Sequence, residues 1–140
     1  MTENYKIIGS FIKDMSSETP DTPTHIFVRD KISKYKLNID INSKAVKNGI
    51  IEVNTIIKFS DQPEILKKAH FEITYTSIVK VDEKVSDKKE MEKIILCDVP
   101  NKIYPDLQRI FLSLLTDSGY PGIKFEKKVD FTELYKQRAN

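Results

Sequence analysis

Histidine and cysteine are the residue types of this chain best suited to acid–base, nucleophilic or metal chemistry. The 140 residues include two histidines, His25 and His70, and one cysteine, Cys97. Zinc sites need several Cys or His ligands, and these three residues lie far apart in the sequence. A cysteine nucleophile needs an activating base, whereas Cys97 follows the apolar residues 94–96, as a buried inert thiol would. We therefore expect no metal site, and a surface or edge histidine at His70.

Carboxylates and tyrosines offer a second set of chemical groups. Asp14 and Glu18 could form a catalytic pair, but solvated loop acids are the simpler interpretation, and binding of a partner protein is a third. The tyrosines could line a ligand pocket or pack in the core. Neither GxxxxGK[ST] nor GxGxxG occurs, and the chain has 4 glycines, so a nucleotide loop is not expected. The sequence thus predicts neither an enzyme nor a cofactor. The tyrosines considered are Tyr35, Tyr75, Tyr104, Tyr120 and Tyr135.

Length and composition favour one globular domain over residues 1–140. The chain is 39% apolar and 31% charged, and its 23 basic and 21 acidic residues give a net charge of +2. This interleaved balance does not support binding to nucleic acid. No apolar window of about 18 residues predicts a membrane span, and the first residues do not resemble a signal peptide. A single cysteine fits the reducing cytoplasm.

Alternating apolar and polar residues predict strands in the first half of the chain. Residues 34–42 alternate strictly, Asn48-Gly49 supplies a turn, and a second alternating run covers 50–59. Residues 60–63 break that run, and a third covers about 66–81. Connections this short predict an antiparallel meander.

The segment 5–15 is also strand-like, but it carries apolar residues on both alternations. Ile8 and Ile12 share one alternation, whereas Ile7 and Phe11 share the other. A strand that is apolar on both faces in so small a protein suggests a contact between subunits. We expect a polar loop with two prolines over about 16–33.

Helices are predicted to follow the strands. Residues 82–93 form a charged connection that is partly helical, and Pro105 fits the first turn of a helix that Gly119 ends. Asp130 and Glu133 form a plausible capping pair for a short last helix, which places Phe131, Leu134 and Tyr135 on one face. Strands followed by helices indicate the α+β class.

Four motifs in this order resemble the SecB family of protein-export chaperones. They span about residues 5 to 138. The first motif is a Lys13-Asp14 pair followed by serine, the acidic Glu18 and two spaced prolines. The second is Cys97 and Pro100 followed by Ile103-Tyr104-Pro105. The third is Gly119-Tyr120-Pro121, and the fourth is Val129-Asp130-Phe131.

The resemblance implies a four-stranded antiparallel sheet with two C-terminal helices, assembled as a homotetramer that is a dimer of dimers. It implies binding of unfolded precursor proteins in an apolar groove and their delivery to the SecA ATPase, without a cofactor and without insertion into a membrane. Two alternatives stay open. One is a SecB-like chaperone dedicated to an antitoxin, and the other is a carrier of a small molecule.

The resemblance also implies roles for individual residues. The residues that match the family's acidic SecA-contacting positions are Asp14, Glu18 and Glu72. The residues at positions where the family's subunit contacts are sensitive to change are Phe71, Ile73 and Tyr75. We add Ile8 to this set because of its place in the first predicted strand. Candidates for the substrate groove, with core packing as the alternative, are Tyr35, Leu37, Ile39, Phe131 and Tyr135.

The chain departs from the family pattern at three points. It is slightly basic, whereas many SecB proteins are acidic. It has Thr76-Ser77 where the family has two glycines, and it ends at Asn140 without the longer tail that assists SecA docking in many members. We expect these changes to leave the fold unaffected and to weaken mainly the coupling to SecA.

Overall fold

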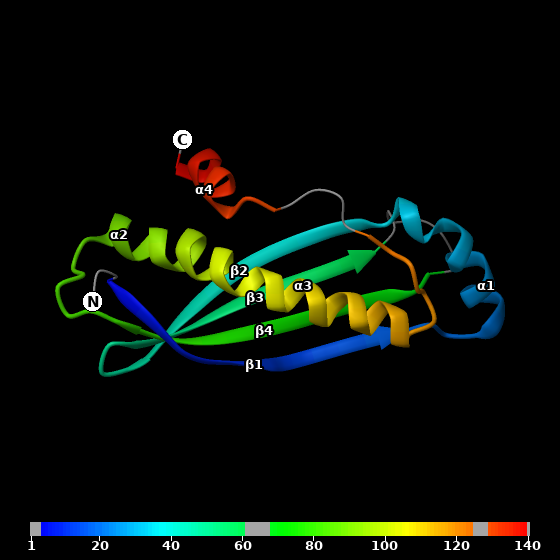
Figure 1. Cartoon of the computed structure of the whole chain (residues 1–140), viewed down its shortest axis with the longest axis horizontal. Helices are drawn as coiled ribbons and strands as arrows, with labels where there is room; N and C mark the ends of the chain where they lie inside the picture. Colours follow the sequence, from blue (N-terminus) through cyan, green and yellow to red (C-terminus); the bar gives the residue numbers. More distant parts are fainter. Residues whose placement is uncertain (1–3, 61–67, 125–128, 140) are drawn as a thin grey trace.

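One antiparallel sheet organises the molecule, and the computed structural model describes residues 4–60, 68–124 and 129–139. Its four strands lie in the order β1-β4-β3-β2 (Figure 1). The predicted meander is confirmed for the last three strands, and the first strand adds to the far side of β4. The predicted break after residue 60 falls largely in 61–67, outside the described residues. The strands are β1 (Tyr5–Glu18), β2 (Lys36–Lys47), β3 (Ile50–Ser60) and β4 (His70–Val81).

The β2–β3 hairpin turns where the sequence predicted it. Asn48 and Gly49 have φ angles of 50° and 75°. Two successive residues with positive φ form the turn whose twist matches the flanking strands, and Asn-Gly is the dipeptide that adopts it most readily. This turn fixes the register, which brings Leu37 opposite Phe59 and Ile39 opposite Ile57.

The predicted loop over residues 16–33 is wrong, because most of it is helical. Strand β1 runs on to Glu18, and helix α1 (Thr22–Lys31) follows, with the short helix η1 (Ile32–Lys34) after it. The Asp21 carboxylate caps α1 by accepting a hydrogen bond from the Thr24 amide at 2.8 Å. Pro23 lies in the first turn, where its missing N–H costs nothing. The Asp and Pro signals thus mark a helix start and not a loop.

The long C-terminal helix begins earlier than predicted. Helix α2 (Lys88–Lys93), a π-helical turn η2 (Ile94–Asp98) and helix α3 (Val99–Asp117) follow one another without a break. Pro105 therefore lies inside α3 and not in its first turn, and the first-turn proline is Pro100. The charged residues from 88 onward form α2, whereas 82–87 connect it to the sheet. A last helix, α4 (Phe131–Ala139), begins where predicted.

Helix α3 lies across one face of the sheet and buries it (Figure 1). We call this the covered face and the opposite one the open face. On β4, Phe71, Ile73 and Tyr75 belong to the covered face, whereas Glu72 and Thr74 belong to the open face, because side chains alternate along a strand. The side chains of α3 buried against the covered face are Ile103, Tyr104, Leu107, Phe111 and Leu115.

Gly119 ends α3, as predicted, and brings α1 against the helix end. Its φ of 97° is favourable only for glycine, and the His25 side chain donates a hydrogen bond from Nε2 to the Gly119 carbonyl at 3.0 Å. The next residue, Tyr120, turns into the core and contacts the His25 ring, with 4.9 Å between centroids.

We expect Gly119→Ala to destabilise the fold more than Gly122→Ala does. Both glycines have positive φ, so each substitution should cost about 1 kcal/mol in backbone strain. A Cβ on Gly119 would also lie 2.7 Å from His25 Nε2, whereas nothing lies within 4 Å of one on Gly122. Urea unfolding should therefore give a loss about 1 kcal/mol larger for Gly119→Ala. Equal losses would show that α1 does not pack tightly against this turn.

Candidate functional site

A pocket of about 350 Å³ lies between the β2 edge of the sheet and helix α4. Its lining is mostly apolar, with Asp40 as the charged group. Ligand pockets in proteins commonly have volumes from about 300 Å³ upward with this kind of lining. Helix α4 lies beyond β2 in Figure 1 and supplies one wall. The lining residues are Ile39, Asp40, Ile41, Leu96, Phe131, Leu134 and Tyr135.

Hydrogen bonds at its N-terminus hold α4 in place. Asp130 caps the helix, as predicted, since its Oδ1 accepts from the amides of Thr132 at 2.9 Å and Glu133 at 3.3 Å. From α3, the Asn101 side chain accepts from the Phe131 amide at 3.3 Å and donates to Thr132 Oγ1 at 3.1 Å. One asparagine therefore joins the start of α4 to α3.

The π-helical turn η2 packs against α4 and supplies a further part of the pocket wall. A turn with an extra residue shifts the side chains that follow, and such turns often occur at functional sites. Here Leu96 lines the pocket, and Cys97 is buried with its Sγ 3.2 Å from Thr132 Oγ1. The predicted burial of Cys97 is confirmed. Further along α4, the Tyr135 hydroxyl donates to the Lys89 carbonyl at 3.4 Å.

The pocket brings together Ile39, Phe131 and Tyr135 of the predicted groove residues, but not Tyr35 or Leu37. Tyr35 is buried, and its hydroxyl donates to the Ala69 carbonyl at 3.2 Å and accepts from the Ala69 amide at 3.1 Å. Leu37 packs against the core opposite Phe59. Both residues thus pack with the core, the alternative that the sequence left open for them.

Three apolar pocket residues were not among the predicted groove residues. Ile41 continues the alternation of Leu37 and Ile39, so the strand pattern could have identified it. Leu134 was predicted on the same helix face as Phe131 and Tyr135, and the structure confirms that face. Leu96 had no such signal, because only the folded π-helical turn directs it into the pocket.

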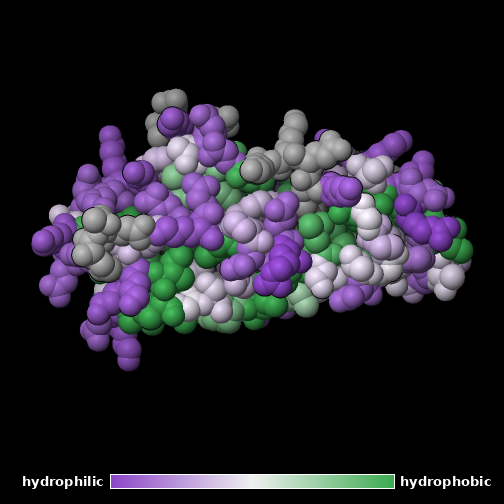
Figure 2. All heavy atoms as spheres, in the orientation of Figure 1, coloured by the Kyte–Doolittle hydropathy of each residue, from purple (hydrophilic) through white to green (hydrophobic). Residues whose placement is uncertain are grey.

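Exposed apolar side chains run along β1, which is an edge of the sheet. The exposed fractions are 52% for Ile8, 45% for Phe11, 41% for Ile12 and 45% for Met15. Figure 2 shows hydrophobic surface along the border where β1 lies in Figure 1. A long edge strand with this much apolar surface is the kind that pairs with another chain.

Two bulges in β1 change the faces that the sequence pattern predicted. Ile8 and Lys13 are extra residues without a direct partner in the β1–β4 register. Ile7 and Ile12 therefore lie opposite Val79 and Tyr75 on the covered face, whereas Phe11 lies opposite Thr76 on the open face. The predicted common face of Ile7 and Phe11 is wrong, because strict alternation does not survive a bulge.

The other residues predicted for subunit contacts lie inside the chain's own core. Phe71 and Ile73 have no exposed surface, and Tyr75 is 9% exposed. Met15 and Ile12 of β1 lie opposite Ile73 and Tyr75. Any influence of these β4 residues on a subunit contact would therefore pass through β1, and among the residues named for this role only Ile8 is well exposed.

The three predicted acidic contact residues share the open face. Asp14 and Glu18 are exposed on β1 opposite Thr74 and His70, and Glu72 lies between those two residues on β4. Glu72 is 3.9 Å from the Lys58 ammonium and 3.6 Å from His70 Nε2. His70 is itself half-exposed at the start of β4, so the predicted surface position is confirmed, although β4 is an inner strand.

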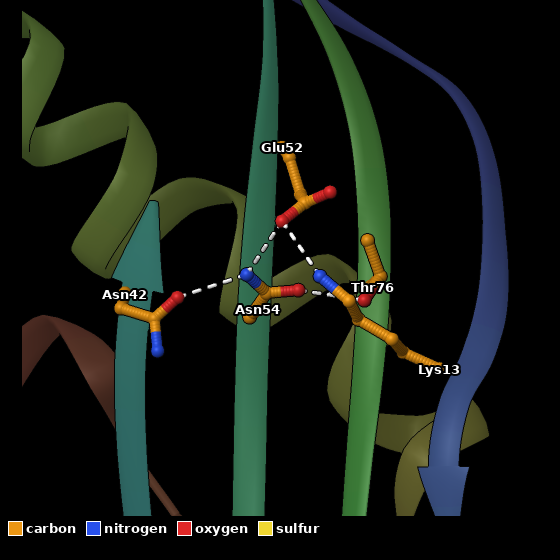
Figure 3. Close-up of polar contacts among 5 residues, drawn as sticks. All are labelled: Lys13, Asn42, Glu52, Asn54 and Thr76. Carbon is orange, nitrogen blue, oxygen red and sulfur yellow. Dashed lines mark hydrogen bonds and ion pairs between the residues drawn. The ribbon is translucent and has the colours of Figure 1, made fainter. Parts of the chain in front are cut away.

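A polar network on the open face joins all four strands (Figure 3). Asn54 of β3 donates to Asn42 of β2 at 2.8 Å and to Glu52 at 3.0 Å, and it accepts from Thr76 of β4 at 2.6 Å. Lys13 of β1 reaches across β4 to Glu52 Oε2 at 3.0 Å. The hydrogen bond from Asn54, and then the one from Lys13, lower the pKa of Glu52 and keep it ionised.

Other kinds of site were sought in the part of the chain that the structure describes. Among those residues, no group of three or more His, Cys, Asp or Glu side chains is placed to hold a metal ion. Likewise, none of the helices described is long and apolar enough to cross a membrane.

Comparison with known proteins gives a consistent result. The family model described as preprotein translocase subunit SecB matches residues 1–140. A protein of Pelagibacter ubique that carries the provisional name protein-export protein SecB is 95% identical over the full length of both chains. The protein-export protein SecB of Methylocella silvestris is 23% identical, over 93% of this chain and 79% of the relative.

Solved structures extend the similarity to the fold. A SecB-like chaperone of Mycobacterium tuberculosis, in complex with a ChAD peptide from an antitoxin, matches with a TM-score of 0.68 and 11% identity over 90% of this chain and 88% of that one. A Streptococcus agalactiae protein of unknown function matches with a TM-score of 0.53 and 7% identity, over 88% of this chain and 97% of that one. At these identities, the likeness concerns the fold.

Proposed function

Because the chain belongs to the SecB family of protein-export chaperones, we propose that it binds unfolded precursor proteins, keeps them from folding and aggregating, and delivers them to SecA. The observation that supports client binding is the apolar pocket between β2 and α4. The family is one of chaperones and not of enzymes, so the proposal includes neither catalysis nor a cofactor. We place this activity in the cytoplasm, where precursors are made.

The pocket suits the apolar side chains of an unfolded chain. Burying apolar surface removes it from water with a gain of about 25 cal/mol per Å², whatever the sequence that supplies it. One pocket of about 350 Å³ holds little of a client and would bind it weakly. Several such pockets on one oligomer can engage one long chain together, which raises the affinity without a sequence requirement.

We expect Leu134→Asn to weaken the binding of unfolded clients about tenfold, since it places an amide where apolar surface is offered. Leu134 lines the pocket and is 47% exposed, so the change leaves the core intact. Phe131 is less suitable, because it is buried against Tyr104 and its truncation would loosen α4 itself. The measurement is fluorescence anisotropy with a permanently unfolded protein, reduced carboxymethylated lactalbumin.

The matched control for the pocket variant is Ile26→Asn on α1. Ile26 has a similar exposed fraction of 51% but does not line the pocket. The Ile26→Asn variant should bind the client as tightly as the wild type does. If both variants bind it equally well, this pocket is not the client site.

We also propose that the chain forms a homotetramer, a dimer of dimers, through the β1 edge. The support is the row of exposed apolar side chains along that strand and its unpaired edge. Pairing of two copies would satisfy the free backbone groups and bury those side chains together.

We expect the double variant Ile8→Lys with Ile12→Lys to reduce the tetramer to smaller species. Lysine charges in the contact would have to be desolvated, which opposes association. Native mass spectrometry measures the species directly. Val46→Lys is the control, because Val46 is 55% exposed at the far end of β2. A tetramer that persists in the double variant would exclude the β1 edge as the contact.

The open face is the proposed docking surface for SecA, with Asp14, Glu18 and Glu72 as its acidic contacts. This assignment is supported by the position of all three residues on one face, away from the client pocket on the covered side. A chaperone built this way could hold a client and a basic partner surface at once. Lys58 beside Glu72 reduces the negative charge at that point.

We expect Glu72→Lys to lower the affinity for SecA about tenfold and to leave client binding unchanged, because it reverses one charge on the docking face. Surface plasmon resonance at low salt measures the first quantity and client anisotropy the second. Glu83→Lys, a charge reversal in the exposed connection after β4, is the control. Equal affinity of both variants for SecA would remove Glu72 from the interface.

The two alternatives give different outcomes in these experiments. A chaperone dedicated to an antitoxin would bind its one partner tightly and unfolded lactalbumin poorly. A carrier of a small molecule would be purified with a discrete ligand, visible by mass spectrometry, and the Leu134→Asn variant would lose that ligand.

A further inference from the structure

The bulge at Lys13 decides which face of the sheet the acidic side chains of β1 occupy. Ile12 lies opposite Tyr75, and Asp14 lies opposite the next residue of β4, Thr74, so Lys13 is the extra residue. Directly opposed residues of neighbouring strands project to the same face. Ile12 is therefore on the covered face and Asp14 on the open face, whereas strict alternation would put both on the covered face.

The consequence extends to the end of β1. Ser16 lies opposite Glu72 and Glu18 opposite His70, so both project to the open face with Asp14. Without the extra residue, a one-residue slip would move these side chains to the face that α3 covers. The common acidic face of Asp14, Glu18 and Glu72 thus depends on the bulge.

Lys13 is also the residue of the bulge that is anchored elsewhere in the sheet. Its ammonium lies 3.0 Å from Glu52 Oε2, on β3, two strands away (Figure 3). Glu52 is itself held in place, because the side chain of Asn54 donates to the same Glu52 oxygen at 3.0 Å. Asn54 is buried, with 6% of its surface exposed. Asn54 is fixed in turn by its bonds to Thr76 and Asn42.

We propose that Lys13 and Glu52 are positioning residues, which fix the bulge in β1 and thereby present Asp14 and Glu18 beside Glu72 to a basic partner surface. This inference rests on the docking face of the proposed function. Surface ion pairs contribute little to global stability, so the effect concerns the local register and the presentation of side chains. The lowered pKa of Glu52 agrees with a carboxylate that stays ionised as an anchor.

The decisive variant is Lys13→Met, because two mechanisms predict opposite results. If Lys13 acted only through its charge, its removal beside an acidic face would strengthen the binding of a basic partner. If it positions the bulge, its removal should weaken the binding of SecA about fivefold, the loss expected when one anchoring ion pair is broken. Lys13→Arg keeps the cation and should bind within about twofold of the wild type.

The control is Lys6→Met, which removes the same charge from β1 on the open face, away from the Lys13 bulge. The affinity of all four proteins for purified SecA is measured by surface plasmon resonance, and hydrogen exchange of the amides in residues 12–18 is followed by mass spectrometry. We expect weaker SecA binding and faster exchange for Lys13→Met alone, with client binding unchanged. Binding of Lys13→Met as tight as that of Lys6→Met overturns the inference.

The exchange measurement separates this inference from the proposed partner. If the wild type does not bind SecA, the proposed delivery step is wrong, and exchange still tests the bulge. Faster exchange in residues 12–18 of Lys13→Met than of Lys6→Met then supports the positioning role. Equal exchange in the two variants refutes it.

Discussion

The packing of α3 on one face of the sheet is the constraint from which the rest of the structure follows. Leu107, Phe111 and Leu115 of α3 bury one face of β3 and β4, and this burial of apolar surface favours folding. The other face can therefore carry charged and polar residues, because nothing has to be packed against it. Both edge strands also keep free surfaces, β1 with exposed apolar side chains and β2 with the pocket beside α4. One-sided burial thus separates three surfaces that the proposed function needs to be separate.

Irregularities in regular elements place the functional side chains. The bulge at Lys13 directs Asp14 and Glu18 to the open face, and the π-helical turn η2 directs Leu96 to the pocket. Each irregularity adds one residue to a repeating pattern, and each is tied by side-chain bonds. Lys13 is held by Glu52, and Cys97 of η2 lies against Thr132 of α4.

Thr76 and Ser77 of β4 take part in this arrangement. Thr76 donates to Asn54 at 2.6 Å within the polar network, and Ser77 lies 3.3 Å from the Ser10 hydroxyl of β1. Both are buried, so their hydroxyls need partners, and they find them in the neighbouring strands. These cross-strand hydrogen bonds link β4 to its neighbours on each side.

The sequence alone determined the strand and helix periods, the Asn48-Gly49 turn, the Asp130 cap and the end of α3 at Gly119, because each depends on residues close together in the chain. Its motifs also indicated the family, and its alternation placed Ile39 on the strand face that lines the pocket. It did not determine α1, whose Asp21 and Pro23 signals fit a loop as well as a helix start. Only the tertiary structure decided the faces of β1, the burial of Tyr35 and the pocket role of Leu96. These depend on bulges and on contacts between distant segments, which a local pattern does not contain.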